Sequence, residues 1–245
     1  MHKFFVPSKN ISLDTIVVSD KEQLRHIQRA LRLKINDELA AFDDSGNEYR
    51  CAIKELLKDK IILEIKEKHS QGREEKIKVT FACAIPKKSK MDDIIDKLTQ
   101  LGVRRIIPLK TERVIIKLDK FKEASRLRRW QKIALAAAEQ SQRSSVVIID
   151  SAKSIKEALK ETYTYDLKII STLEGERKPL KEVFTQPNPK NILVFIGPEG
   201  DFTAEEVELA KNAGCVAVSL GELVLRVETA AVAVASYIKL GDGSL

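Results

Sequence analysis

The stretch that decides the fold is residues 191–240, NILVFIGPEGDFTAEEVELAKNAGCVAVSLGELVLRVETAAVAVASYIKL. Its first apolar run, residues 192–196, predicts a buried strand. The segment Gly197–Gly200 follows, and Thr203 then begins a Thr-Ala-Glu-Glu pattern, whose threonine and last glutamate cap the free N–H groups at the start of a helix. We expect this helix to end at Gly214, because glycine readily adopts the left-handed conformation that closes helices.

A second strand, loop and helix complete the stretch. Residues 215–220 form another apolar run, residues 221–228 have neither helical nor strand periodicity, and residues 230–240 predict a helix capped by Thr229. Two strands therefore each end in a glycine-bearing loop that leads into a helix. In open α/β sheets, ligands bind at the carboxyl ends of the strands, so the sequence predicts a ligand site in these loops.

The composition is that of an ordinary soluble globular protein. Of 245 residues, 43% are hydrophobic and 32% are charged, and no apolar run approaches the roughly 18 residues of a membrane span. The N-terminal residues lack the apolar segment of a signal peptide. Cys51, Cys83 and Cys215 are widely separated, which argues against zinc and against disulfides. We therefore expect a cytoplasmic protein with buried cysteines, no metal and no membrane segment.

The positive charge of the chain is unevenly distributed. The net charge is +7 and the pI is about 9.2, but most of the excess of lysine and arginine lies in residues 76–145, whereas residues 146–245 are slightly acidic. A basic block of this density favours a polyanionic partner, most often nucleic acid. The alternative is that these side chains serve solubility alone.

Two domains are expected. Residues 1–70 predict a small β-rich domain, because several short strands at this spacing are typical of a barrel, and residues 69–75 predict a linker. From residue 76 to residue 245, strands alternate with helices, which predicts an α/β domain with a mostly parallel sheet. The expected strands are residues 3–7, 38–42, 48–56, 60–67, 78–85, 103–109, 146–149 and 167–171, and the expected helices are residues 20–31, 89–101, 121–142, 154–161 and 179–184.

Basic side chains gather at two places that suit RNA. Arg25, His26, Arg29 and Arg32 project from one short segment and form a candidate phosphate-contacting cluster. Arg143 ends the basic helix, where RNA or a partner subunit would lie. For His26 the alternative is an ordinary surface or capping histidine.

The absence of several motifs restricts the chemistry. No GxGxxG follows the first strand of the second domain, no GxxxxGK[ST] loop is present, and histidine is nearly absent from that domain. A dinucleotide-dependent oxidoreductase, a histidine-based triad and a metal site are therefore disfavoured. Methyl transfer from a sulfonium cofactor fits better, because the cofactor activates the methyl group and the protein mainly aligns the reactants.

Two motifs carry a specific resemblance. FIGPEGDFTAEE (195–206) and SLGELVLRVETAAVA (219–233) resemble the paired signature of the SPOUT methyltransferases, and most closely that of the RsmE family, which methylates N3 of a uridine in the decoding region of 16S ribosomal RNA. Residues 26–32, 97–103 and 138–143 resemble further motifs of this family, so the likeness covers both expected domains.

The resemblance implies an architecture and a set of partners. It implies a small PUA-like β-barrel domain over residues 1–70, which binds RNA. Residues 76–245 would be a SPOUT-type α/β methyltransferase domain with a C-terminal trefoil knot. It also implies a homodimer, S-adenosylmethionine as the cofactor, and 16S rRNA in the small ribosomal subunit as the substrate.

The resemblance places the cofactor among three loops and assigns roles within them. Gly197 and Gly200 would permit close backbone approach to the cofactor; the alternative is a tight turn before a capped helix. For Thr229 the alternative is helix capping. The implied cofactor-binding residues are Thr172, Leu173, Ile196, Gly197, Gly200, Leu220, Gly221, Leu225, Arg226 and Thr229.

Arg226 is the expected catalytic side chain, because a fixed guanidinium stabilises negative charge developing on O2 or O4 of the uracil. Glu228 or Glu199 would orient this arginine or accept the N3 proton. The sequence also departs from the family. Asp201 replaces the second glycine of the family's GPEGG, and since aspartate is favourable at a helix N-terminus, we expect altered loop geometry rather than lost binding. Asn36 replaces a turn glycine, which asparagine can do because it tolerates the left-handed conformation.

Two other functions remain open at this point. One is ribose 2′-O-methylation by the same kind of domain. The other is a non-catalytic ribosome-binding factor that uses the basic middle of the chain as an RNA patch.

Overall fold

A computed structural model describes residues 1–69, 76–86, 90–113, 120–184 and 189–241. The chain divides into two compact units, of which one comprises Met1–Glu74 with Ala138–Val146 and the other Glu75–Ala137 with Val147–Leu245. The expected linker at residues 69–75 lies almost entirely outside the described residues. The sequence analysis assigned residues 138–146 to the second domain, but their contacts group them with the first unit.

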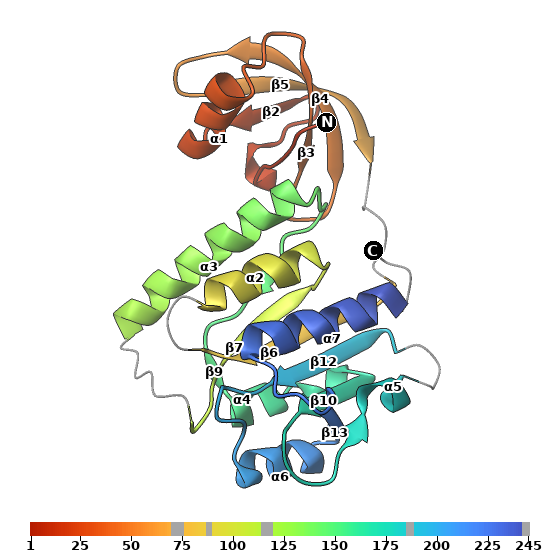
Figure 1. Ribbon diagram of the computed structural model, residues 1–245. Helices are drawn as coiled ribbons and strands as arrows, with labels where there is room; N and C mark the ends of the chain where they lie inside the picture. Colours follow the sequence, from red (N-terminus) through yellow and green to blue (C-terminus); the bar gives the residue numbers. More distant parts are fainter. Residues whose placement is uncertain (70–75, 87–89, 114–119, 185–188, 242–245) are drawn as a thin grey trace. The chain divides into compact units, whose positions relative to one another are not determined.

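The first unit is built on a sheet of five described strands in the order β1-β3-β4-β5-β2, in which the β1–β3 pair is parallel and the others are antiparallel. Register shifts at Arg50/Cys51 and Ile53/Glu55 interrupt the β4–β5 pairing, and such bulges bend a strand and increase its twist. The expected β-rich domain is confirmed (Figure 1). The strands are β1 (Lys3–Phe5), β2 (Thr15–Val18), β3 (Glu38–Phe42), β4 (Glu48–Leu56) and β5 (Ile61–His69).

The helical segment of this unit differs from the single helix expected over residues 20–31. Helix α1 (Lys21–Arg25) begins at Asp20, whose carboxylate accepts hydrogen bonds from the N–H groups of Glu22 and Gln23 at 2.9 and 3.0 Å. It continues as a π-helical turn, His26–Ala30, which Arg32 ends in the left-handed region (φ 53°). Leu24 and Ile27 are buried in the core between this segment and the sheet.

The second unit is an α/β domain with an entirely parallel sheet, as expected. Its described strands follow the order β11-β13-β10-β12-β6-β7-β8, and β9 also pairs with β7. The strands are β6 (Lys78–Ala84), β7 (Arg105–Lys110), β8 (Ile148–Ile149), β9 (Lys153–Ser154), β10 (Leu167–Ser171), β11 (Lys178–Pro179), β12 (Asn191–Ile196) and β13 (Val216–Ser219). The helices are α2 (Lys90–Gln100), α3 (Lys120–Gln140), α4 (Ile155–Leu159), α5 (Leu180–Val183), α6 (Ala204–Asn212) and α7 (Val227–Gly241), with a short 3-10 turn at Thr162–Thr164. A further 3-10 turn, Ser8–Asn10, belongs to the first unit.

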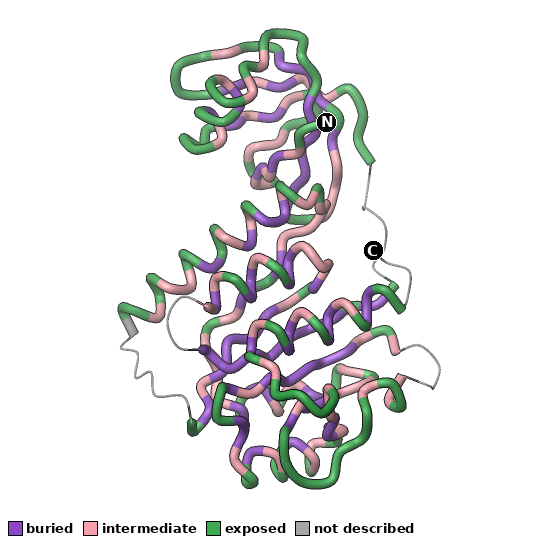
Figure 2. The backbone as a smooth tube through the Cα atoms, in the orientation of Figure 1, coloured by how far each residue is buried: buried purple, intermediate pink, exposed green. Residues whose placement is uncertain are grey.

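Helices cover both faces of this sheet because successive side chains of a strand point to opposite faces. On β12, Ile192, Val194 and Ile196 pack in one core with α2, α3 and α7, whereas Leu193 and Phe195 pack in the other with α4 and α6. Figure 1 shows α2 and α7 side by side, and Figure 2 shows the central strands buried along most of their length.

Local sequence signals set the helix ends. Thr203 and Glu206 form the expected capping box of α6, with hydrogen bonds of 3.2 and 3.0 Å to each other's backbone N–H groups. Gly214 (φ 83°) ends that helix, and Gly102 (φ 76°) follows α2. Asn36 has a φ of 73°, so the expectation that it adopts the left-handed conformation is confirmed.

Candidate functional site

The carboxyl ends of the parallel strands bring five loops to one edge of the sheet. Ser171 of β10 lies opposite Ile196 of β12, which in turn lies opposite Cys83 of β6. The loops after β13, β10 and β12 therefore emerge side by side, in the order of these strands, and the loops after β6 and β7 continue the row. The two loops in which the sequence predicted a ligand site, after β12 and β13, and the third loop implied by the resemblance, after β10, belong to this row, as expected for an open α/β sheet.

The loop after β12 is tied to the loop after β10 through Asp201. One carboxylate oxygen of Asp201 accepts hydrogen bonds from the Thr172 hydroxyl at 2.9 Å and from the Leu173 N–H at 2.7 Å. Thr172 is 4% exposed and Leu173 43% exposed, so the first is part of the core and the second faces outward. Thr172 and Leu173, two of the implied cofactor-binding residues, are thereby bonded to the residue that directly follows the Gly197–Gly200 segment.

At both glycines of this loop, the position that a Cβ atom would occupy lies next to other residues of the protein. A Cβ atom on Gly197 would lie 3.1 Å from the ring of Phe202 and 3.2 Å from the carboxylate of Asp201. A Cβ atom on Gly200 would lie 3.5 Å from the side chain of Arg113. A side chain at 197 would therefore require Phe202 or Asp201 to shift by a few tenths of an ångström.

The loop after β13 is more open. Gly221 has a φ of 123°, and a Cβ atom there would meet nothing within 4 Å. Leu223 and Val224 are 79% and 72% exposed, whereas Leu220 and Leu225 pack partly against the core. This loop therefore has a free surface beside its glycine.

Helix α7 begins earlier than expected. The carbonyl of Arg226 accepts the hydrogen bond from the Ala230 N–H at 2.8 Å, and the helix runs from Val227 to Gly241. Thr229 therefore lies inside the first turn, exposed, and the expectation that it caps the helix is wrong. The side chain of Arg226 is exposed at the helix start.

Glu228, in the same turn, is paired with a lysine that the sequence analysis did not single out. The ammonium of Lys90, at the start of α2, lies 2.8 Å from Oε1 of Glu228. Burial raises the pKa of the Glu228 carboxyl, but the Lys90 ammonium, the helix backbone and the Arg226 charge outweigh it and hold this pKa below its usual value. Its Oε2 atom is buried and has no hydrogen-bond partner among the described residues.

The loop after β7 also joins this edge, and it too was missed. Oε1 of Glu206 accepts a hydrogen bond from the Glu112 N–H at 3.0 Å, while Arg113 donates to the carbonyl of Gly200. The hydroxyl of Thr111 is buried without a partner among the described residues. No local pattern marks these contacts, because they join residues far apart in the sequence.

The candidate RNA contacts belong to the first unit. Arg25, His26, Arg29 and Arg32 are all exposed, and the ring of His26 meets that of Phe4 edge-on at 5.9 Å. Arg143 is half-buried in the segment that joins this unit, and its guanidinium donates to the Ser145 hydroxyl at 3.3 Å. All of the residues assigned to RNA are therefore in one compact unit.

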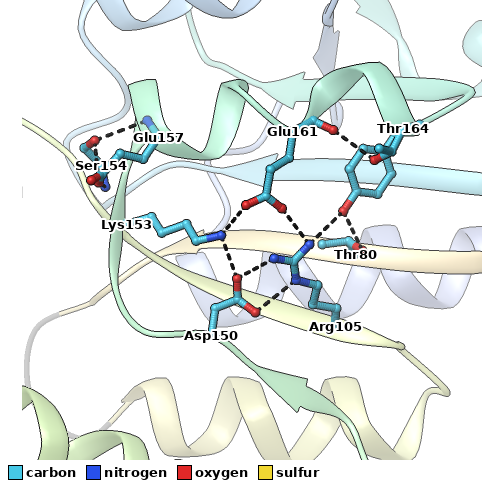
Figure 3. A network of polar contacts seen from close by, with 9 residues as sticks. Thr80, Arg105, Asp150, Lys153, Ser154, Glu157, Glu161 and Thr164 are labelled. Atoms are coloured by element: carbon cyan, nitrogen blue, oxygen red, sulfur yellow. Dashed lines mark hydrogen bonds and ion pairs between the residues drawn. The ribbon is translucent and has the colours of Figure 1, made fainter.

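Figure 3 shows a second polar cluster in the α/β unit, around β7 and α4. The guanidinium of Arg105, the first residue of β7, contacts Asp150 at 2.5 Å and Glu161 at 2.7 Å, and Lys153 contacts Asp150 at 2.8 Å. Tyr165 extends this network to Thr80. The two positive and two negative side chains balance, so the cluster joins β7 to the segments around α4 without a surplus charge.

No group of His, Cys, Asp or Glu side chains among the described residues could hold a metal ion. No helix within the described ranges has the length and apolarity needed to span a membrane. Cys51, Cys83 and Cys215 are buried, and burial raises the pKa of the Cys51 and Cys215 thiols to about 12.

Comparison with known proteins gives the family. An RNA methyltransferase domain model matches residues 73–239, and an RNA methyltransferase PUA domain model matches residues 18–66. The ribosomal RNA small subunit methyltransferase E of Bacillus subtilis is 33% identical over 214 residues, which cover 85% of this chain and 84% of that protein.

Solved structures agree over nearly the whole length. Ribosomal RNA small subunit methyltransferase E from Neisseria gonorrhoeae, bound to S-adenosyl methionine, has a TM-score of 0.84 at 30% identity, with 98% of this chain and 97% of that chain covered. A putative methyltransferase from Legionella pneumophila, in complex with the same cofactor, has a TM-score of 0.86 at 28% identity and the same coverage. The match of both domains, in order and along the full chain, places this protein in the ribosomal RNA small subunit methyltransferase E family.

Proposed function

We propose that this protein transfers a methyl group from S-adenosylmethionine to N3 of a uridine in the decoding region of 16S rRNA in the small ribosomal subunit. One observation carries the proposal. The two segments that resemble the family signature, residues 195–206 and 219–233, contribute loops to the same carboxyl edge of the parallel sheet. Relatives that match over nearly the whole chain are named for this class of reaction, and two of them bind S-adenosylmethionine.

The residues at this edge fit such a cofactor. The open side of Gly221 and the exposed side chains of Leu173, Leu223 and Val224 offer a main-chain surface with apolar contacts, which suits an adenosyl group. When bound, S-adenosylmethionine supplies a methyl group that is already activated for transfer. The residues proposed to hold it are Thr172, Leu173, Ile196, Gly197, Gly200, Leu220, Gly221, Leu225, Arg226 and Thr229.

Two charged side chains are proposed to act on the uracil. The guanidinium of Arg226, exposed at the start of α7, stabilises negative charge on O2 or O4 as N3 loses its proton. Glu228 is proposed to accept that proton, because the depressed pKa keeps its carboxyl ionised and its Oε2 atom has no partner among the described residues. Because Oε1 of Glu228 already accepts a hydrogen bond from Lys90, Glu228 is less suited to orienting Arg226.

The first unit is proposed to hold the RNA. Arg25, His26, Arg29 and Arg32 present their side chains to solvent from one short segment, and such clusters fix a protein on a phosphate backbone. Arg143 belongs to the same unit. This division leaves the α/β unit to the cofactor and the chemistry.

A homodimer is part of the proposal. The sequence predicts an α7 that is apolar nearly all round, yet Tyr237 and Leu240 are 42% and 67% exposed and lie one turn apart beside exposed Ala233. A second copy of the chain would cover this stripe. We also propose the trefoil knot and a cytoplasmic location, both on the family resemblance. Gel filtration with light scattering tests the dimer.

Nucleoside analysis of rRNA tests the proposed reaction. Small-subunit rRNA from a strain that lacks this gene should lose N3-methyluridine, and a plasmid copy should restore it. Loss of a 2′-O-methyl nucleoside instead would favour the ribose methylase. If the purified protein gives no heat with S-adenosylmethionine in calorimetry, the non-catalytic ribosome-binding factor becomes the better account.

A further inference from the structure

Asp201 combines three properties that do not usually occur together. Its backbone is left-handed, with a φ of 62°. Residues other than glycine, asparagine and aspartate rarely adopt this conformation. It is only 9% exposed. One of its carboxylate oxygens accepts hydrogen bonds from both Thr172 and Leu173, at 2.9 and 2.7 Å.

This position corrects the role that the sequence suggested. Helix α6 begins at Ala204 and its cap is Thr203, so Asp201 stands before the cap. Its carboxylate points to the loop after β10 and is engaged there. The left-handed backbone explains how aspartate replaces a glycine of the family pattern, and its two hydrogen bonds are contacts that a glycine would not make.

The rest of the loop after β10 is held at other atoms. The Thr172 N–H donates to the carbonyl of Val218 at 3.2 Å, and Arg177 donates to the carbonyl of Thr172 at 3.0 Å. These bonds fix the peptide groups on either side of Thr172. The N–H of Leu173 and the hydroxyl of Thr172 are fixed by Asp201, so this carboxylate sets the direction in which the next residues leave the sheet.

We propose that Asp201, which stands where the family pattern has a glycine, is a positioning residue for the cofactor in this chain: its carboxylate fixes the Thr172–Leu173 segment for binding. The idea rests on the proposed function, since it assumes that this segment binds S-adenosylmethionine. A single oxygen accepts both bonds, so an amide oxygen at the same place would serve as well. The acceptor atom therefore matters more than its negative charge.

The first test needs no ligand. Hydrogen exchange followed by NMR measures the protection of the Leu173 amide in the free protein. Asp201→Gly keeps the left-handed backbone and removes the acceptor, so protection of this amide should fall at least about tenfold, while Asp201→Asn keeps it within about threefold. Unchanged protection in Asp201→Gly would overturn the proposal.

The second test measures binding by calorimetry with S-adenosylmethionine. Asp201→Gly should weaken binding about tenfold, which corresponds to about 1.4 kcal/mol, and Asp201→Asn should restore it. Asn36→Gly is the matched control, because Asn36 also has a left-handed backbone (φ 73°) and lies in the other unit. Its affinity should equal that of the wild type.

The outcomes separate this proposal from the proposed function. Wild-type protein that does not bind S-adenosylmethionine contradicts the function. If the wild type and Asp201→Gly bind S-adenosylmethionine with equal affinity, the positioning role of Asp201 is contradicted and the proposed function is not.

Discussion

The ammonium of Lys90 lies 2.8 Å from Oε1 of Glu228, and this pair joins the first turns of α2 and α7. The two side chains are 30% and 25% exposed, so the attraction is less screened than on an open surface. It holds a carboxylate ionised beside the start of the helix that carries Arg226. The pair therefore links the start of α2 to the proposed chemistry.

Replacing Lys90 should change the pH dependence of the reaction. Burial raises the pKa of Glu228, and the Lys90 ammonium, the helix backbone and the Arg226 charge together more than offset it. Lys90→Met removes the largest of these lowering contributions, so the pKa rises. The carboxylate then becomes protonated at a higher pH, and the acid limb of the profile of kcat/KM against pH moves upward. Lys97→Met is the matched control, since exposed Lys97 pairs with Asp96 on the same helix. Identical profiles for Lys90→Met and the wild type would show that Glu228 is not the proton acceptor.

The Arg105 cluster should stabilise the α/β unit. The side chains of Arg105 and Asp150 are 24% and 11% exposed, and removing one partner of a largely buried pair is costly. Arg105→Met is expected to lower the free energy of unfolding at pH 7 by about 2 kcal/mol in urea denaturation. Arg104→Met, an exposed neighbour, should have little effect.

The same cluster predicts how the free energy of unfolding changes with pH. Arg105 and Lys153 hold the pKa values of Asp150 and Glu161 below their usual 3.8 and 4.5, although burial opposes this in both. The stabilisation is therefore complete above about pH 4.5 and is lost as pH falls through the depressed values. The difference between Arg105→Met and the wild type should shrink at acid pH, and a difference that stays constant would contradict the assignment.

The strands and helices could be predicted well where the signal is local. The capping box at Thr203 and the glycine at Gly214 bound α6 to within a residue of its observed limits. Strand β2 (Thr15–Val18) was missed, because its four residues are too few to show a period. The start of α7 was placed late, since nothing in the local sequence marks Arg226 as the residue before the helix.

The site could be predicted only in part, for a physical reason. The loops were found because they follow strands. Lys90 with Glu228, and Asp201 with Leu173, are pairs separated by 138 and 28 residues. Such contacts depend on strand order and register, which the chain pattern does not specify.

Glu139 should anchor the C-terminal end of α3 within the first unit. Its carboxylate accepts hydrogen bonds from the Phe5 N–H at 3.0 Å and from Gln23 at 2.8 Å. Glu139→Ala removes the acceptor of the Phe5 N–H and one of the two acceptors of the Gln23 amide, which keeps the Phe5 carbonyl. The free energy of unfolding should therefore fall by about 2 kcal/mol. Glu139→Gln retains an acceptor and should be far less destabilising. Equal losses in the two variants would contradict the anchoring role.

Glu139 also predicts a pH effect of the opposite sign to that of Asp150. Burial raises its pKa above the usual 4.5, and the two hydrogen bonds offset this only partly. Its contribution to stability is therefore present below about pH 4.5 and is lost as pH rises through the folded-state value. Relative to the wild type, Glu139→Gln should gain stability between pH 4.5 and pH 7.

The arginines of the first unit should govern affinity for RNA. Arg25→Ala combined with Arg29→Ala removes two exposed charges without disturbing a buried contact. Binding to small ribosomal subunits is expected to weaken about tenfold, with a salt dependence shallower by roughly 1 to 2 in the log–log slope. Affinity for S-adenosylmethionine should not change. Lys58→Ala, an exposed residue of the same unit, is the control, and an unaltered salt slope in the double variant would exclude these phosphate contacts.

The most direct measurement is methyl transfer from labelled S-adenosylmethionine to small ribosomal subunits and to naked 16S rRNA, with the product nucleoside identified by mass spectrometry. Wild-type protein should form N3-methyluridine. Arg226→Ala should form almost none while keeping its fold, because only the carbonyl of Arg226, which the change retains, bonds the first turn of α7. Arg104→Ala should remain active. A 2′-O-methyl product, or near-wild-type activity in Arg226→Ala, would contradict the account.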